Sequence, residues 1–261
     1  MLTNIFDTHA HYDDEKFDGD REAVLSSLPS KGVHAVLNAA CDMESCKTSI
    51  QLSQAYDFVY ASVGVHPHSA ESFTKQDVDT IASYTKQPKV AAIGEIGLDY
   101  HYDFSPRDVQ KQVFERQIQL ALDLDLPIIV HDREAHADTM ELLKKYRPRG
   151  IVHCYSGSAE MAKEILKLGM YIAFGGAVTF KNARKVVEAA ASVPLERLLV
   201  ETDCPYMSPE PFRGTRCDSS LIAYTAQKLA ELHHTDPQSL LDQTCKNAYD
   251  VYQINNHSHS L

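Results

Sequence analysis

Short apolar runs alternate with amphipathic segments along the whole chain, and this alternation is what most constrains the fold. Eight runs rich in β-branched residues qualify as strands: Asn4–His9, His34–Ala39, Phe58–Val63, Val90–Gly94, Ile128–His131, Ile151–His153, Met170–Phe174 and Arg197–Glu201. Apolar strands that alternate with helical segments are typical of βα units around a parallel sheet. Eight such units favour a closed barrel over an open sheet. The sequence therefore predicts an α/β fold, a single (β/α)₈ TIM-type barrel.

The helices expected between and after these runs are clearest in three segments. Ser105–Asp125 carries apolar residues at helical spacing, with Pro106 at a suitable first helical position after Ser105 as the cap. Ser219–Leu232 and Pro237–Tyr252 are expected to be closing helices, and Asn255–Leu261 a frayed, flexible tail. No low-complexity linker divides the chain, and barrels commonly reach about 250 residues as one unit. One domain over residues 1–261 is expected.

Charge and cysteine content narrow the possible classes of function and location. The formal net charge is −11, which argues against a basic groove that follows a long nucleic acid. A nucleic-acid substrate would need metal ions or a local cluster of arginines. The six cysteines form no Cys-x-x-Cys pair and are expected to be reduced thiols. With no signal-peptide pattern and no run of about 20 apolar residues, we expect a cytoplasmic protein without membrane contact. No obligate protein partner is indicated.

The first predicted strand ends in a pattern that suits a metal ion. Side chains in a strand repeat every two residues, so His9 and His11 point to one face and can bind one cation. Asp7 lies one step lower and is expected to hold a histidine ring by a hydrogen bond. The chain has 13 histidines, so one such pair could arise by chance. Alone, it leaves metal binding and a polar loop about equally open.

The same kind of residue recurs at four other strand ends. Glu95 follows the fourth strand, and His131 and His153 end the fifth and sixth. Glu201 ends the eighth strand, and Asp203 follows two residues later. In a barrel all strand carboxyl ends meet on one rim, where active sites lie. The predicted metal ligands are thus His9, His11, Glu95, His131, His153 and Asp203. They can hold two divalent cations (Mg²⁺, Mn²⁺ or Zn²⁺) if one carboxylate, expected to be Glu95, bridges them. Glu201 is expected to orient a ligand.

Six motifs in order along the chain resemble those of the TatD family of metal-dependent deoxyribonucleases, in the amidohydrolase superfamily. They are Asp7-Thr8-His9-Ala10-His11, Gly64-Val65-His66-Pro67-His68, Gly94-Glu95-Ile96-Gly97-Leu98-Asp99, His131-Asp132-Arg133, His153-Cys154-Tyr155-Ser156-Gly157 and Glu201-Thr202-Asp203-Cys204-Pro205-Tyr206. The resemblance implies an amidohydrolase-type barrel, a binuclear metal centre, the same six ligands and metal-dependent DNase activity. One departure concerns substrate preference: many relatives carry Arg-Asn-Glu-Pro where this chain has Arg216-Cys217-Asp218-Ser219.

Other rim residues are candidates for contact with substrate. His66 and His68 follow the third strand and could bind phosphate or, for His66, transfer a proton; the alternative is a turn with exposed imidazoles. Arg133 could reach a phosphate or simply pair with a carboxylate. Arg216, with Arg213, could clamp a phosphate, because guanidinium matches phosphate bidentately. A solvated loop is an equally good interpretation of that pair.

The predicted reaction is metal-dependent hydrolysis of a phosphodiester, most simply in DNA. The metal centre would bring the pKa of a bound water toward neutrality, and Asp203 would accept the proton of the nucleophile. The main alternative is an amidohydrolase or esterase acting on a small cyclic amide or an aminoacyl ester. A binding protein that keeps the barrel without catalysis would be expected to have lost ligands, whereas all six are present.

Overall fold

The computed structural model describes residues 1–254, so the predicted tail Asn255–Leu261 lies outside the described residues. Eight parallel strands form one sheet in the order β1-β2-β3-β4-β5-β6-β7-β8. The strands are β1 (Ile5–Ala10), β2 (Val33–Asn38), β3 (Val59–Val63), β4 (Val90–Asp99), β5 (Ile128–Arg133), β6 (Gly150–Val152), β7 (Tyr171–Phe174) and β8 (Leu198–Val200). Sequential order throughout a parallel sheet is the arrangement of a (β/α)₈ barrel, and the predicted fold class is confirmed.

The barrel closes where the residues after β8 meet β1. Ala10 and Cys204 form an isolated parallel bridge, and the backbone N–H of Asp203 donates to the carbonyl of His9 over 2.9 Å. These bonds place the segment after β8, with Asp203, directly beside the two histidines of β1.

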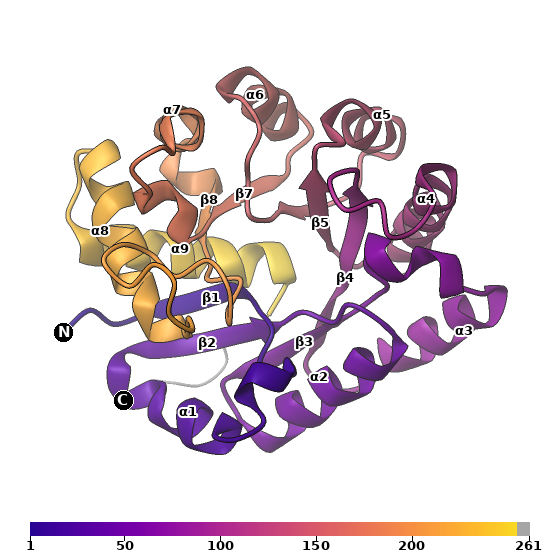
Figure 1. Ribbon diagram of the computed structural model, residues 1–261, viewed down its shortest axis with the longest axis horizontal. Coiled ribbons are helices and arrows are strands. Elements are labelled where there is room, and N and C mark those ends of the chain that lie inside the picture. Colours follow the sequence, from indigo (N-terminus) through magenta and orange to yellow (C-terminus); the bar gives the residue numbers. More distant parts are fainter. Residues whose placement is uncertain (255–261) are drawn as a thin grey trace.

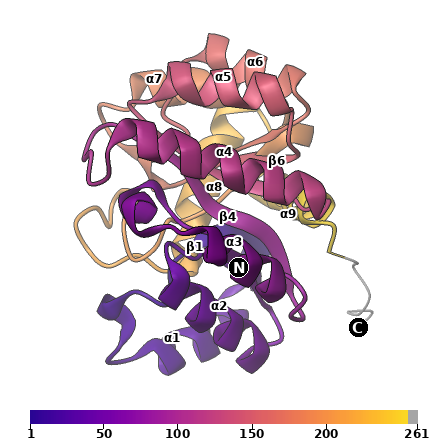
Figure 2. The ribbon, with the colours of Figure 1, turned by 90° about the vertical axis from the view of Figure 1, so that its right-hand side faces the viewer.

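Helices α1 to α8 lie around the sheet, and α9 lies across one end of it (Figures 1 and 2). They are α1 (Arg21–Ser27), α2 (Met43–Ala55), α3 (Lys75–Tyr84), α4 (Arg107–Asp123), α5 (His136–Tyr146), α6 (Ala159–Lys167), α7 (Arg184–Ser192), α8 (Ile222–Leu232) and α9 (Pro237–Tyr252). Capping side chains begin several of them: Asp42 accepts backbone N–H bonds from Glu44 and Ser45 at α2, which satisfies donors that the first turn leaves free.

An apolar interior and the last helix close the lower end of the barrel. One buried cluster draws side chains from seven strands and α9: Phe6, Ala35, Leu37, Ala39, Ala91, Ala92, Ile129, Ile151, Ala173, Leu199, Cys245, Ala248, Val251 and Tyr252. The side-chain amide of Asn247 donates to the carbonyls of Leu195 and Leu198, at the start of β8. Helix α9 therefore packs against the interior of the barrel and is bonded near the start of β8.

Element boundaries differ from the predictions mainly at β4. This strand was expected to end at Gly94 but continues to Asp99, because Ile96 and Leu98 are fully buried and the strand pairs with β5 up to Arg133. Gly97 has a φ of 150°, and a Cβ there would overlap the carbonyl of His131. Helix α4 begins at Arg107 with Pro106 as its cap, and a 3₁₀ turn precedes α8.

Two further expectations can be compared with the structure. No helix among the described residues combines the length and the apolar character needed to cross a membrane. All six cysteines are free thiols, as the cysteine pattern predicts.

Candidate metal centre

The six predicted ligands come together at the carboxyl-terminal rim of the barrel. His9 and His11 lie on β1 and just after it, Glu95 on β4, His131 on β5, His153 directly after β6, and Asp203 in the segment after β8. The six ligands come from the ends of five strands, and the closed barrel brings these ends together. Their polar atoms belong to overlapping groups that could hold a metal ion, three of which include Glu95. We divide the atoms by the Glu95 oxygen that they face into a first and a second donor group.

The first donor group consists of His9, His11, Asp203 and one oxygen of Glu95. The Nε2 atoms of the two histidines lie 2.9 Å apart. Oδ1 of Asp203 lies 3.7 Å and 3.3 Å from the Nε2 atoms of His9 and His11. Oε2 of Glu95 lies 3.2 Å and 3.6 Å from the same two nitrogens. Two nitrogens and two oxygens therefore converge on one small volume.

The second donor group consists of His131, His153 and the other oxygen of Glu95, and His66 lies beside it. Oε1 of Glu95 lies 2.7 Å from Nδ1 of His131 and 2.7 Å from Nε2 of His153. Nε2 of His66 lies 3.5 Å from the same oxygen. The rings of His9 and His153 stack with their centroids 3.8 Å apart, so the two groups are in contact.

Glu95 connects the two groups and is ionised there. Its side chain is only 3% exposed, and burial alone would favour the neutral acid. The surrounding imidazoles, His153 first, outweigh burial and hold the pKa of the Glu95 carboxyl well below its usual value. A similar balance, with His11 as the main partner, lowers the pKa of Asp203. Both carboxylates are thus charged at neutral pH.

Hydrogen bonds on the far sides of the rings direct lone pairs into the cluster. Nδ1 of His11 lies 2.9 Å from the carbonyl of Ala39, which can only accept, so this nitrogen carries the proton and leaves the Nε2 lone pair free. Nε2 of His131 lies 3.1 Å from Oδ2 of Asp99, and Nδ1 of the same ring lies 2.7 Å from Oε1 of Glu95. In a neutral ring whose proton is on Nε2, the Nδ1 lone pair therefore points into the cluster. Imidazole nitrogens and carboxylate oxygens are ligands for divalent transition ions. The donor set therefore fits a divalent metal site.

Asp7 has a different role from the one expected. Its carboxylate accepts bonds from the backbone N–H and the hydroxyl of Thr202, and from the hydroxyl of Ser219. Among residues 1–254 it has no hydrogen bond to a histidine ring. The pairing of β1 with β2 shifts register between Asp7 and Ala10. Strict alternation from His9 therefore does not predict which groups the Asp7 side chain contacts. Its carboxylate instead ties β1 to the segment after β8.

His66 and His68 are fixed at the rim by local bonds. Nδ1 of His66 accepts the backbone N–H of His68, which puts the proton of the neutral ring on Nε2, toward Glu95. Burial lowers the pKa of His66 to about 4, so the ring is neutral and suited to donate a hydrogen bond. Nε2 of His68 lies 2.9 Å from Oδ2 of Asp99. Neither ring is a freely exposed turn residue.

The three arginines predicted near the site have different surroundings. The guanidinium of Arg133 lies over the ring of Tyr102, 4.7 Å from its centroid. Arg216 makes two bonds of 2.7 Å and 2.6 Å to the carboxylate of Asp20. Arg213 lies over the ring of Phe180. Phosphate binding by Arg216 stays a prediction, and it would require exchange of Asp20 for the phosphate.

Two residues near the cluster were not assigned a role from the sequence. Asp99 holds the rings of His68 and His131; it lies four residues after Glu95 in the extended β4, and that even spacing is the signal that could have identified it. Cys41 lies just after β2, with its sulfur 4.0 Å from Glu95. Burial raises the pKa of the Cys41 thiol to about 11, so it is neutral there. Nothing in its sequence context marks it.

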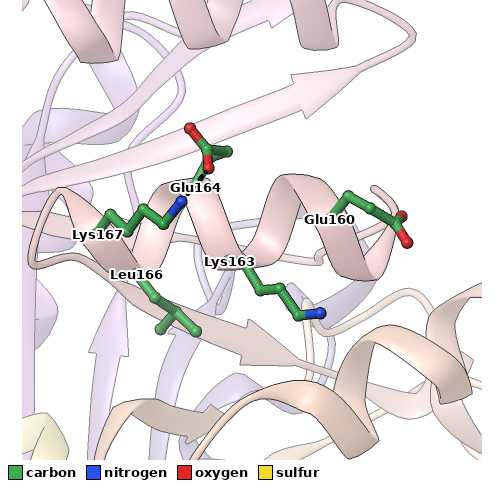
Figure 3. Close-up of a pocket in the computed structure, with 5 residues that line it drawn as sticks. All are labelled: Glu160, Lys163, Glu164, Leu166 and Lys167. Atoms are coloured by element: carbon green, nitrogen blue, oxygen red, sulfur yellow. Dashed lines mark hydrogen bonds and ion pairs between the residues drawn. The ribbon is translucent and has the colours of Figure 1, made fainter.

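A surface hollow beside α6 is separate from this centre. It has a volume of about 610 Å³ and is lined by Glu160, Lys163, Glu164, Leu166 and Lys167 (Figure 3). Lys167 pairs with Glu164 over 2.7 Å, and the lining contains no imidazole or thiol. This hollow therefore offers no group of the kind found in the two donor groups.

Comparison with known proteins agrees with this arrangement. The family model described as TatD related DNase matches residues 6–253. The chain belongs to the TatD family of metal-dependent hydrolases. A Bacillus subtilis (strain 168) protein named uncharacterized metal-dependent hydrolase YabD is 42% identical over 254 residues, which cover 96% of this chain and 100% of the relative.

Two other TatD relatives extend the comparison. The Citrobacter koseri protein named 3′-5′ ssDNA/RNA exonuclease TatD is 30% identical, with 96% of this chain and 99% of the relative covered. The crystal structure of the TatD homologue YjjV from Escherichia coli K12 superposes with a TM-score of 0.90 at 31% identity, covering 97% of this chain and 100% of that one. The sequence-based assignment to the TatD family is confirmed.

Proposed function

We propose that this TatD-family hydrolase cleaves phosphodiester bonds in single-stranded nucleic acid with two divalent cations, one in each donor group. The observation that carries the proposal is the position of Glu95, whose two oxygens face different groups. A carboxylate offers two anionic oxygens to cations about 3.5–4 Å apart, the spacing of two-metal phosphodiesterases. The Citrobacter koseri relative, named as an exonuclease of single-stranded DNA and RNA, supports this class of substrate.

The protein groups have distinct parts in the proposed reaction. Bound divalent cations supply a water of lowered pKa and neutralise charge on the phosphate. Asp203 is the most exposed of the six ligands, with 20% of its side chain accessible, and accepts the proton of the attacking water. His66, neutral and with its proton on Nε2, donates to a non-bridging oxygen of the phosphate. Arg133 and His68 lie beside the same rim and position the strand.

The net charge of −11 fits a short single strand better than a long duplex. Neutralising a duplex backbone takes many lysines and arginines. In this chain the 25 lysines and arginines are outnumbered by 36 aspartates and glutamates. Divalent cations held by the two donor groups would supply positive charge at the barrel rim, next to the scissile phosphate. Affinity for the rest of the strand must come from other contacts.

Substrate panels test the proposal directly. Protein loaded with Mg²⁺, Mn²⁺ or Zn²⁺ is incubated with single-stranded and double-stranded DNA, with RNA, and with cyclic amides and aminoacyl esters. We expect metal-dependent release of nucleotides from single strands, and a chelator should abolish it while circular dichroism shows intact secondary structure, because a barrel of this size folds on its apolar core. Turnover of amides or esters without cleavage of any nucleic acid would show that the alternative reaction is the right one.

A further inference from the structure

Two exposed aromatic side chains lie together beside His68 at the barrel rim. Among the described residues, the exposed large apolar side chains are Met1, Leu122, Tyr102, Phe104 and Tyr206. Tyr102 and Phe104, 47% and 63% exposed, lie in the loop that follows β4, and Tyr206 lies three residues after Asp203. Single exposed apolar residues are ordinary, but a group of them beside a charged centre indicates a contact surface.

Tyr102 and Phe104 form a stacked pair with a cation on one side. Their ring centroids lie 5.2 Å apart with an interplanar angle of 19°. The guanidinium of Arg133 lies 4.7 Å from the centroid of Tyr102. Over the part of the chain that the structure describes, Arg133 has no carboxylate within ion-pair distance. Its charge is therefore available to a ligand, in contrast to that of Arg216.

The same carboxylate fixes this pair and the metal cluster. Oδ1 of Asp99 accepts the backbone N–H groups of His101 and Tyr102, over 3.0 Å and 2.9 Å. Oδ2 of Asp99 accepts from the rings of His68 and His131. The ring of Phe104 lies edge-on to His68, with centroids 4.8 Å apart. The aromatic loop is thus held in a fixed position relative to the second donor group.

We propose that Tyr102, Phe104 and Arg133 form a stacking site for nucleobases of the single strand next to the scissile phosphodiester, an inference that rests on the proposed function. Aromatic faces bind any base, and only an unpaired strand exposes base faces for stacking. The guanidinium beside Tyr102 adds a cation for the neighbouring phosphate. Stacking also supplies affinity that an acidic protein cannot obtain from a basic groove. An amide-binding barrel has no need of such a site.

Kinetics on matched substrates test the stacking site. The metal-loaded enzyme is given a single-stranded oligonucleotide, and the same oligonucleotide with abasic nucleotides at the end that is cleaved. Phe104→Ala and Tyr102→Ala are expected to raise KM for the normal strand about 10-fold while kcat changes little. On the abasic strand, wild type and variants should have the same KM. Leu122→Ala is the matched control, since Leu122 is 44% exposed but lies on α4.

A second variant measures binding without turnover. The chain contains no tryptophan, so Phe104→Trp keeps an aromatic ring and introduces one fluorophore at the site. The normal oligonucleotide should quench its fluorescence, and the abasic oligonucleotide should not. Equal quenching by both strands, or an unchanged KM in Phe104→Ala while nucleic acid is still cleaved, would overturn the stacking site and leave the proposed function standing. Failure of the wild type to cleave any nucleic acid would instead remove the proposed function itself.

Discussion

The two donor groups of the candidate metal centre are held in place in different ways. The first group depends on barrel closure, because Asp203 reaches His9 and His11 only through the bonds that join the segment after β8 to β1. In this group, the ring nitrogen of His11 that faces away from the cluster donates to the backbone carbonyl of Ala39. The second group is supported by carboxylates: Asp99 bonds to His131, and Glu201 lies 3.6 Å from Nδ1 of His153. Carboxylate support raises the basicity of a histidine ligand. We therefore expect the second group to bind its cation more tightly.

The largest effect is expected from the one residue that both groups share. Glu95→Gln removes the charge between them, so metal stoichiometry should fall from two toward one and activity should fall by about 10⁴-fold, since the metals contribute several kcal/mol to the transition state. Metal analysis and kinetics of wild type and variant side by side measure both changes. The control is Glu115→Gln. It changes a carboxylate on α4 that is paired with Lys145 of α5. Two tightly held ions in Glu95→Gln would contradict the bridging role.

The first group can be changed separately through Asp203. Asp203→Asn keeps the size of the side chain but accepts no proton, and loss of a general base costs about 10²–10⁴-fold in rate. The variant should retain one tightly bound ion, held by the second group. Near-normal turnover would assign the proton transfer to another residue, and His66 would then be examined first.

A smaller effect is expected from the support of the second group. Asp99→Asn weakens the bond to His131, and loss of such a partner typically lowers metal affinity or activity about 10–100-fold. Titration with metal should show weaker binding at one site and unchanged binding at the other. Asp103→Asn, four residues further along the chain and paired with Arg107, should leave both affinities unchanged. Equal weakening at both sites in Asp99→Asn would mean that the groups are not independent.

Metal affinity is also expected to depend on pH. Burial disfavours the charged form of His131, but its bonds to Asp99 and Glu95 raise the pKa of the ring in the metal-free protein. The pKa of His153 is likewise raised by Glu95 and Glu201, against the effect of burial. Because the pKa of each ring is raised, protons begin to compete with the metal at a pH above the ordinary pKa of histidine, and they compete more strongly as the pH falls. Affinity should therefore fall as pH falls, about tenfold per pH unit for each proton displaced. Titrations at about pH 8 and about pH 6 would contradict this if the affinity were the same.

The sequence predicts most of the fold because the barrel depends on a repeated pattern. Apolar strands of similar length that end in His or Glu are visible without any tertiary information, and sequential strand order then brings those ends together. Alternation fails where the register shifts, at Asp7 in β1 and beyond Gly94 in β4. The extension of β4 is why the place of Asp99 beside His131 was not foreseen.

Side-chain contacts between residues that are distant in sequence are the second feature that the sequence does not predict. Arg216 appears free for phosphate when only its own loop is considered, but Asp20, 196 residues earlier, occupies it. Arg133 shows the reverse: a neighbouring carboxylate was a reasonable expectation, and an aromatic ring lies there instead. Such pairings depend on how loops from different βα units meet above the rim, and no local pattern records that.

The central claim is that Glu95 joins two cations at one centre, and Mn²⁺ loading tests it most directly. Two Mn²⁺ ions that share a carboxylate are exchange-coupled, and their electron paramagnetic resonance spectrum has about half the hyperfine spacing of an isolated ion, the separation being about 3.5–4 Å. We predict this coupled spectrum in the wild type at two equivalents of Mn²⁺, and an isolated-ion spectrum in Glu95→Gln. An isolated-ion spectrum in the fully loaded wild type would contradict the account.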